Sequence, residues 1–127
     1  MESDKYHIDI EIDKLTNSIE NAISGDCFST EIHRIENSDF TTVKKSKGWM
    51  FNWKEEANQN DRQVYKLTIQ GNAKVIQGLV CMSDFQDHIY LHLIESAPFN
   101  LGMHKLYKGV PGNLIAFASK LSFDFGY

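Results

Sequence analysis

Three apolar segments in the second half of the chain are separated only by short polar turns. They cover residues 64–69, 75–82 and 89–93. In the last segment apolar side chains occupy every second position, which places them on one face of a strand. The turns at Gly71-Asn72 and at residues 84–87 are too short for a crossover connection, so consecutive strands must run antiparallel. This stretch predicts an antiparallel meander and limits the chain to folds that contain one.

The regions around the meander predict further strands and two helices. Alternation and aromatic content predict strands over residues 6–12, 28–35 and 49–53, and apolar residues at helical spacing predict helices over residues 15–24 and 112–123. Gly25 and Gly126 follow these helices as stop signals. Trp49 and Trp53 are expected in the core, because aromatic side chains mostly serve burial. The predicted fold class is α+β, with a mixed, mainly antiparallel sheet on which the helices pack.

Length and composition indicate one globular domain that spans residues 1–127. Hydrophobic residues make up 42% and charged residues 24%, which excludes an intrinsically disordered chain. A net charge of −4 lacks the basic field that nonspecific nucleic-acid binding needs, so no nucleic-acid partner is expected. The longest apolar stretches, at residues 79–82 and 114–118, are far short of the roughly 20 residues of a membrane helix. No membrane partner is expected, and residues 1–5 show no secretory pattern, which favours a cytoplasmic protein.

Two smaller sets of residues have both a structural and a functional interpretation. Cys27 and Cys81 lie far apart, without partners at metal-ligand spacing, so neither a disulfide framework nor a metal site is expected. Both are predicted to be small packing residues. Lys44, Lys45 and Lys47 form a short basic run, for which the sequence favours a solvated loop over a phosphate-binding patch.

A glycine-containing turn precedes the predicted C-terminal helix and reads Lys108-Gly109-Val110-Pro111-Gly112-Asn113. The first turn of a helix leaves backbone N–H groups unpaired, and glycine lets a ligand approach them closely. With the helix dipole, these groups make a site for an anion the size of a diphosphate, to which Lys108 adds positive charge. The alternative is an ordinary loop-to-helix junction. The turn has neither the glycine spacing of a dinucleotide fingerprint nor the Gly-Lys-Ser/Thr of a triphosphatase loop.

Residues 64–127 resemble the GNAT superfamily of N-acetyltransferases. The resemblance rests on Ile94-Glu95-Ser96-Ala97-Pro98 at the end of the last meander strand and on the glycine turn with the helix that it opens. Segments near residues 49–53 and 64–67 resemble a bacterial subgroup of that superfamily. The resemblance implies an enzyme that transfers an acyl group from acetyl-coenzyme A to a small-molecule or peptide amine.

The resemblance also implies which residues hold the coenzyme. Its pyrophosphate would lie on the turn, against Lys108, Gly109, Val110, Gly112 and Asn113. Its pantetheine arm would pair with the backbone of Leu93, Ile94 and Ser96.

GNAT domains continue beyond this helix with a further strand, a helix and a hairpin, so the resemblance implies a C-terminally truncated domain. The strand before the helix would then keep an open edge, and such edges pair with other chains. We therefore expect a homodimer, formed by edge pairing or strand exchange. A second interpretation of the function follows: a noncatalytic GNAT-like domain that associates with proteins through this edge. A third is an unrelated α+β binding module whose glycine turn is purely structural.

Glu95 is the candidate general base. Acyl transfer to an amine needs a group that removes a proton from the ammonium ion before attack. Glu95 stands at the strand corner where the acyl group would arrive, near the apolar residues Ile94 and Ala97. Its alternative role is structural, in which it caps the corner through hydrogen bonds to the backbone. His88 and His92 are expected to face solvent or to be partly packed.

Overall fold

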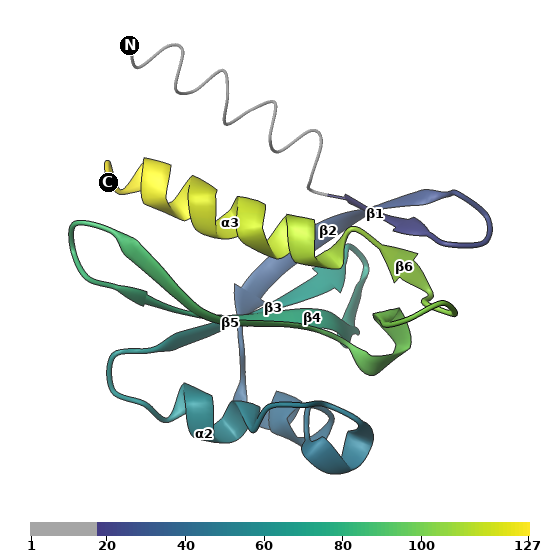
Figure 1. Ribbon diagram of the computed structural model, residues 1–127, viewed down its shortest axis with the longest axis horizontal. Coiled ribbons are helices and arrows are strands. Elements are labelled where there is room, and N and C mark those ends of the chain that lie inside the picture. Colours follow the sequence, from purple (N-terminus) through teal and green to yellow (C-terminus); the bar gives the residue numbers. More distant parts are fainter. Residues whose placement is uncertain (1–17) are drawn as a thin grey trace.

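The computed structural model describes residues 18–127, which form a curled antiparallel sheet with helices on both faces (Figure 1). The strands are β1 (Ser18–Asn21), β2 (Cys27–Arg34), β3 (Gln63–Ile69), β4 (Asn72–Asp84), β5 (Ile89–Ser96) and β6 (Tyr107–Lys108). Their order is β5-β4-β3-β2-β1-β6, and every pairing within residues 18–127 is antiparallel. The α+β class is confirmed, while the sheet of the described residues is antiparallel throughout rather than mixed.

The helical elements lie on opposite faces of this sheet. The α-helices are α2 (Trp53–Ala57) and α3 (Val110–Asp124), and the 3-10 helices are η1 (Asn37–Thr41), η2 (Lys45–Lys47) and η3 (Pro98–Asn100). α3 packs along one face against β1, β4 and β5, whereas α2 and the coils that precede it cover the other face (Figure 1). None of the helices in residues 18–127 combines the length and the apolar character that a membrane span requires.

Each face of the sheet buries its own apolar cluster. The cluster under α3 comprises Ile19, Leu67, Val80, Met82, Val110, Leu114 and Ala118. The cluster on the α2 face comprises Val43, Trp49, Trp53, Val64, Ile76, Leu79, Cys81 and Ala97. The core positions expected for Trp49 and Trp53 are confirmed. β4 contributes to both clusters because alternate residues of a strand point to opposite faces.

Most of the predicted elements from residue 63 onward are confirmed. The meander is β3, β4 and β5, and the strand predicted over residues 28–35 is β2. α3 begins two residues earlier than the predicted start at residue 112. Pro111 fits within its first turn because the N–H that proline lacks would have no partner inside the helix.

The helix predicted from Leu15 is wrong over residues 18–24, where the chain forms β1 and a tight turn into β2. β1 pairs with β2 on one side and with β6 on the other, and Ile19 is buried in the α3-side cluster. The side chain of Asn21 accepts hydrogen bonds from the N–H groups of Ile23 and Ser24, which closes the turn. Hydrogen bonds on both edges of β1 thus stabilise it as a strand, although its apolar residues are spaced as in a helix. Residues 15–17 and the strand predicted over residues 6–12 lie outside the described residues.

The strand predicted over residues 49–53 is also wrong. The N–H groups of Met50 and Phe51 donate to the side chain of Glu95 instead of to a neighbouring strand. Asn52 accepts a hydrogen bond from the Glu55 N–H at 3.1 Å and caps α2. The aromatic residues are therefore presented to the core by a loop and the start of a helix.

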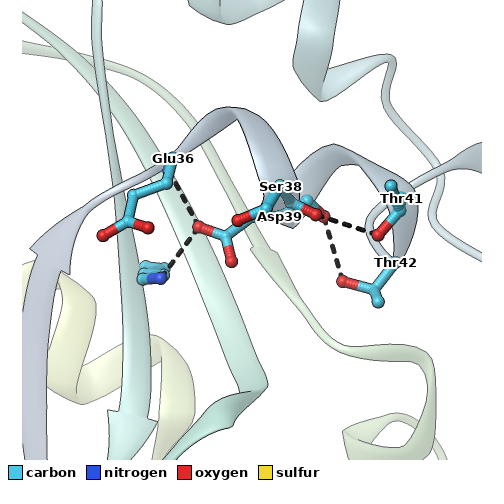
Figure 2. A network of polar contacts seen from close by, with 6 residues as sticks. Glu36, Ser38, Asp39, Thr41 and Thr42 are labelled. Carbon is cyan, nitrogen blue, oxygen red and sulfur yellow. Dashed lines mark hydrogen bonds and ion pairs between the residues drawn. The ribbon is translucent and has the colours of Figure 1, made fainter.

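A buried ion pair fixes η1 to the sheet (Figure 2). Asp39 Oδ2 accepts a hydrogen bond from the Glu36 N–H at 2.8 Å and lies 2.8 Å from Nζ of Lys66, which is on β3. The side chains of Asp39 and Lys66 are 16% and 9% exposed. The hydroxyl groups of Thr41 and Thr42 donate to backbone carbonyls of the same turn. The Asp39–Lys66 ion pair therefore holds the beginning of the segment between β2 and β3 against the sheet.

α3 packs directly against Gly78 of β4. A Cβ atom at position 78 would lie 2.6 Å from Cγ1 of Val110 and 3.2 Å from Cδ1 of Leu114. It would also lie 3.1 Å from the carbonyl oxygen of Glu95 on β5. Glycine at this position therefore lets the first turn of α3 rest on the β4–β5 pair.

We expect Gly78→Ala to lower the free energy of unfolding by about 1–3 kcal/mol, the usual cost of overpacking a core. The added methyl group would have to displace Val110 and Leu114. Gly112→Ala is the matched control, because nothing lies within 4 Å of a Cβ there and alanine favours helix more than glycine does. Urea unfolding of both variants measures the difference, and equal stabilities would contradict this packing.

Candidate functional site

The first turn of α3 presents backbone N–H groups that have no acceptor in the described part of the protein. α3 follows Gly109, whose φ of 93° lies in the left-handed region that favours glycine. The amides of Gly109, Val110 and Gly112 have no hydrogen-bond acceptor among residues 18–127. The Asn113 N–H is already used, since it donates to the Gly109 carbonyl at 3.1 Å. The unused donors lie at the positive end of the helix dipole, where an anion is stabilised.

The side chain of Asn113 is used by the fold. Its Nδ2 donates to the carbonyl oxygens of Ser18 and Gly109, each at 2.8 Å, and its Oδ1 accepts from Oγ1 of Thr30 at 2.9 Å. Asn113 therefore joins the start of α3 to β1 and β2. The structure places this predicted coenzyme residue at the turn, but its amide group already has protein partners.

β5 is the last strand in the sheet order, so one of its backbone edges has no partner strand among residues 18–127. On its other edge, β5 pairs with β4 from Ile89 to Ser96. The side chain of Leu93 packs in the α2-side cluster, that of Ile94 packs under α3, and Ser96 is buried. The Ala97 N–H donates to the Gln77 carbonyl of β4, and every second residue repeats this orientation, so the N–H and C=O of Leu93 point toward β4. Ile94 and Ser96 can therefore offer a ligand their backbone groups at the open edge, but not their side chains.

The end of β5 and the start of α3 meet at Gly78. Both the Glu95 carbonyl oxygen and Cγ1 of Val110 lie within 3.1 Å of the position that a Cβ of Gly78 would take. The open edge near Ser96 and the unused amides of α3 are therefore at the same end of the sheet. Lys108 pairs in register with Glu20 of β1, and its exposed side chain lies directly before Gly109.

The Glu95 carboxylate holds the loop that precedes α2. Its Oε2 accepts a hydrogen bond from the Met50 N–H at 2.5 Å. Its Oε1 accepts from the Phe51 N–H at 3.3 Å and from Nε1 of Trp53 at 2.7 Å. The residue is only 8% exposed. This geometry supports the structural role of Glu95, because three hydrogen bonds hold the carboxylate to the loop and burial leaves it little access to a substrate.

A polar cluster on the α2 face of the sheet was not singled out by the sequence. His92 Nε2 lies 2.7 Å from Oγ of Ser83, which is fully buried. Burial, together with the nearby Arg62 guanidinium, lowers the pKa of His92. Arg62 also pairs with Glu56. Burial raises the pKa of the Cys81 thiol to about 11, so Cys81 is a protonated packing residue, as expected.

A register shift on β5 explains why this cluster forms. Cys81 is opposite Leu93 and Met82 is opposite Leu91, so His92 is an extra residue in the strand. The bulge turns His92 toward Ser83 on the same face as Leu93. Strict alternation cannot show such a bulge, which is why the sequence did not reveal the cluster.

A groove of about 370 Å³ runs between the first half of β5 and the second half of α3. Ile89 and Leu91 line it from β5, and Ile115 and Ala118 line it from α3. Tyr127 closes one end, where its hydroxyl group donates to Oδ1 of Asp84 at 2.5 Å. The groove adds an apolar surface beside the open edge of β5.

We expect Glu95→Gln to lower the free energy of unfolding by about 2–3 kcal/mol, because a carboxamide nitrogen would then face a buried donor. Glu55→Gln is the matched control, since the Glu55 side chain is exposed on α2. Urea unfolding followed by tryptophan fluorescence gives both stabilities. Wild-type stability of Glu95→Gln would contradict the anchoring role.

The lowered pKa of His92 predicts a loss of stability in mild acid. The unfolded chain binds a proton at this histidine below about pH 6.5, before the folded chain does, so the free energy of unfolding falls as pH decreases through that value. His92→Gln keeps a group that can bond Ser83 but does not titrate, and should flatten the profile between about pH 7 and pH 5. His33→Gln, at an exposed histidine, is the control. Parallel profiles for His92→Gln and wild type would show that His92 does not titrate in this way.

No protein-family model matches the chain, and no curated protein or solved structure matches it either.

Proposed function

We propose that this chain is a GNAT-like domain that binds acyl-coenzyme A and serves transfer of the acyl group to an amine. The sequence resemblance over residues 64–127 supports this proposal. So does the order of elements, in which an antiparallel meander is followed by a glycine turn and a helix. The free cysteines are compatible with a cytoplasmic location, where thiols stay reduced.

The single observation that carries the proposal is the pairing of two unused sets of backbone groups at one end of the sheet. One set is the amides of Gly109, Val110 and Gly112, which suit phosphate oxygens. The other set is the open edge of β5 from Leu93 to Ser96. The pantetheine arm contains two amide groups, and amides pair with a strand edge as a peptide does. A coenzyme lying along β5 toward α3 would use both.

The transfer step requires an amine nitrogen to attack the thioester carbonyl carbon. A base takes one proton from the ammonium ion, the C–N bond forms and the C–S bond breaks. The second nitrogen proton passes to the leaving thiolate, which becomes the thiol. Glu95 remains the sequence-based prediction for this base. Its contacts with Met50, Phe51 and Trp53 occupy three acceptor positions, so catalysis through Glu95 would use the remaining lone pair of this buried carboxylate.

The alternative function is noncatalytic association through the open edge of β5. The apolar groove beside Ile89 and Leu91 favours it, because an added strand would bury this surface. Strand addition along the whole of β5 and coenzyme binding both need the edge at Leu93–Ser96. The two functions therefore compete for the same backbone groups, and acetyl-coenzyme A should dissociate a dimer formed in this way.

A charge change at Gly112 tests the coenzyme site. Gly112→Asp places a carboxylate in the first turn of α3, which favours the helix but repels a diphosphate. Gly112→Asn has nearly the same shape without the charge, and the site has room for either side chain. We expect Gly112→Asp to weaken acetyl-coenzyme A binding about tenfold or more, and Gly112→Asn to change it by less than about threefold.

Isothermal titration calorimetry of wild type and both variants gives the affinities, and thermal unfolding confirms that the variants are folded. No binding of acetyl-coenzyme A to wild type at millimolar concentration would reject the proposed function. Equal weakening by Asp and Asn would reject the α3 start as the diphosphate site.

A further inference from the structure

The segment between η1 and α2 forms a lysine-lined groove on the α2 face of the molecule. The groove has a volume of about 300 Å³. Its lining includes Lys44, Lys45, Lys54, Asn52, Phe40 and Val43. The chain thus combines cationic, amide and apolar groups around one space.

Positive charge is concentrated in this segment, which Glu55 and Glu56 follow on α2. From residue 40 to residue 54 the chain contains four lysines and no acidic residue, although its net charge is −4. Asp39, the nearest acidic residue before the segment, is bound to Lys66. Lys44, Lys45, Lys47 and Lys54 have no ion-pair partner among residues 18–127. Their mutual repulsion lowers the cost of bringing in an anion.

The backbone that carries these lysines is held in place from several sides. The Lys47 N–H donates to the Lys44 carbonyl at 2.9 Å, and the Gly48 N–H donates to the Lys45 carbonyl at 3.0 Å. Gly48 has a φ of 97°, which lets the chain turn sharply after η2. Val43 and Trp49 are buried on either side of the basic run. The ammonium groups therefore extend from a fixed frame, which distinguishes this segment from a loosely solvated loop.

The lining indicates the chemistry of the ligand. Lys44, Lys45 and Lys54 line this space. Their ammonium groups suit a dianion with several acceptor oxygens, and a phosphate monoester has both properties near neutral pH. The half-buried Phe40 ring and the Val43 side chain provide an apolar wall for the rest of the molecule. We propose that this groove binds a small phosphate monoester whose phosphate contacts Lys44, Lys45 and Lys54 and whose apolar body lies against Phe40.

This site is separate from the proposed coenzyme site. The groove belongs to the α2 face, with Val43 in the α2-side cluster, whereas Val110 at the start of α3 is in the cluster on the other face. The inference therefore does not rest on the proposed function, and each can fail without the other.

Phenyl phosphate is a suitable probe, with phenol and inorganic phosphate as its two halves. Titration of the full chain, followed by ¹H–¹⁵N spectra, should show saturable shifts at residues 40–54. Phenol and inorganic phosphate should each bind at least about tenfold more weakly, because each lacks one of the two contacts. Raising the salt concentration should weaken binding of phenyl phosphate, because exposed charges are screened.

Two double variants with the same change in charge locate the site. Lys44→Gln/Lys54→Gln should weaken phenyl phosphate binding about tenfold or more, whereas Lys74→Gln/Lys105→Gln, at lysines outside both proposed anion sites, should change it by less than about threefold. Glutamine is polar and uncharged, and Lys44, Lys54 and Lys74 are exposed, so folding should be preserved and thermal unfolding checks it. Absence of saturable shifts at residues 40–54, or a larger effect of the second pair, would overturn the proposal.

Discussion

The buried carboxylate of Glu95 is the interaction on which the α2 face of the molecule depends. A charged group removed from water is tolerated only when hydrogen bonds replace its hydration. Here the replacements come from two loop amides and the Trp53 indole. The loop gains its conformation from the same bonds, and with it the position of Trp53 at the start of α2. Glu95 on β5 thus fixes the position of α2, although Trp53 at the start of α2 precedes Glu95 by 42 residues.

The start of α3 is also held in place by contacts with the sheet. These contacts use the side chains at the turn and leave only main-chain groups free to contact a ligand. Gly78 allows Val110 to rest on the β4–β5 pair, and Asn113 binds β1 and β2 through its whole amide. Side-chain groups at the turn are therefore largely occupied by packing, while the amides of Gly109, Val110 and Gly112 remain. A ligand bound there would be recognised by its negative charge and its reach along β5, rather than by side chains specific to its identity.

The sequence predicted the elements whose pattern is local and missed those decided by distant contacts. The meander and α3 follow from alternation, turn residues and helical spacing, all of which lie within the segments concerned. The spacing of apolar residues near β1 predicts a helix. Its strand structure depends on pairing with β6, which joins residues more than 80 positions apart, and local spacing cannot show this pairing. The aromatic pattern of residues 49–53 predicts a strand. The acceptor of the Met50 and Phe51 N–H groups is the side chain of Glu95 on β5, which the local pattern cannot show. At the site, the glycine turn was recognisable, whereas the bulge at His92 and the use of Asn113 by the fold were not.

The two proposed anion sites differ in the kind of group that provides the positive potential. At the start of α3 the unused donors are peptide groups whose direction is set by the helix, so they need little reorganisation to meet an anion. In the groove the charges stand on exposed lysine side chains, which must lose rotamer freedom and are screened by salt. A fixed frame with flexible charges accommodates anions of several shapes, provided that they carry enough charge. A fixed array of amides instead selects the one geometry that it matches. Each proposed site concentrates positive potential locally, so anion binding at either one does not require a basic surface on this acidic chain.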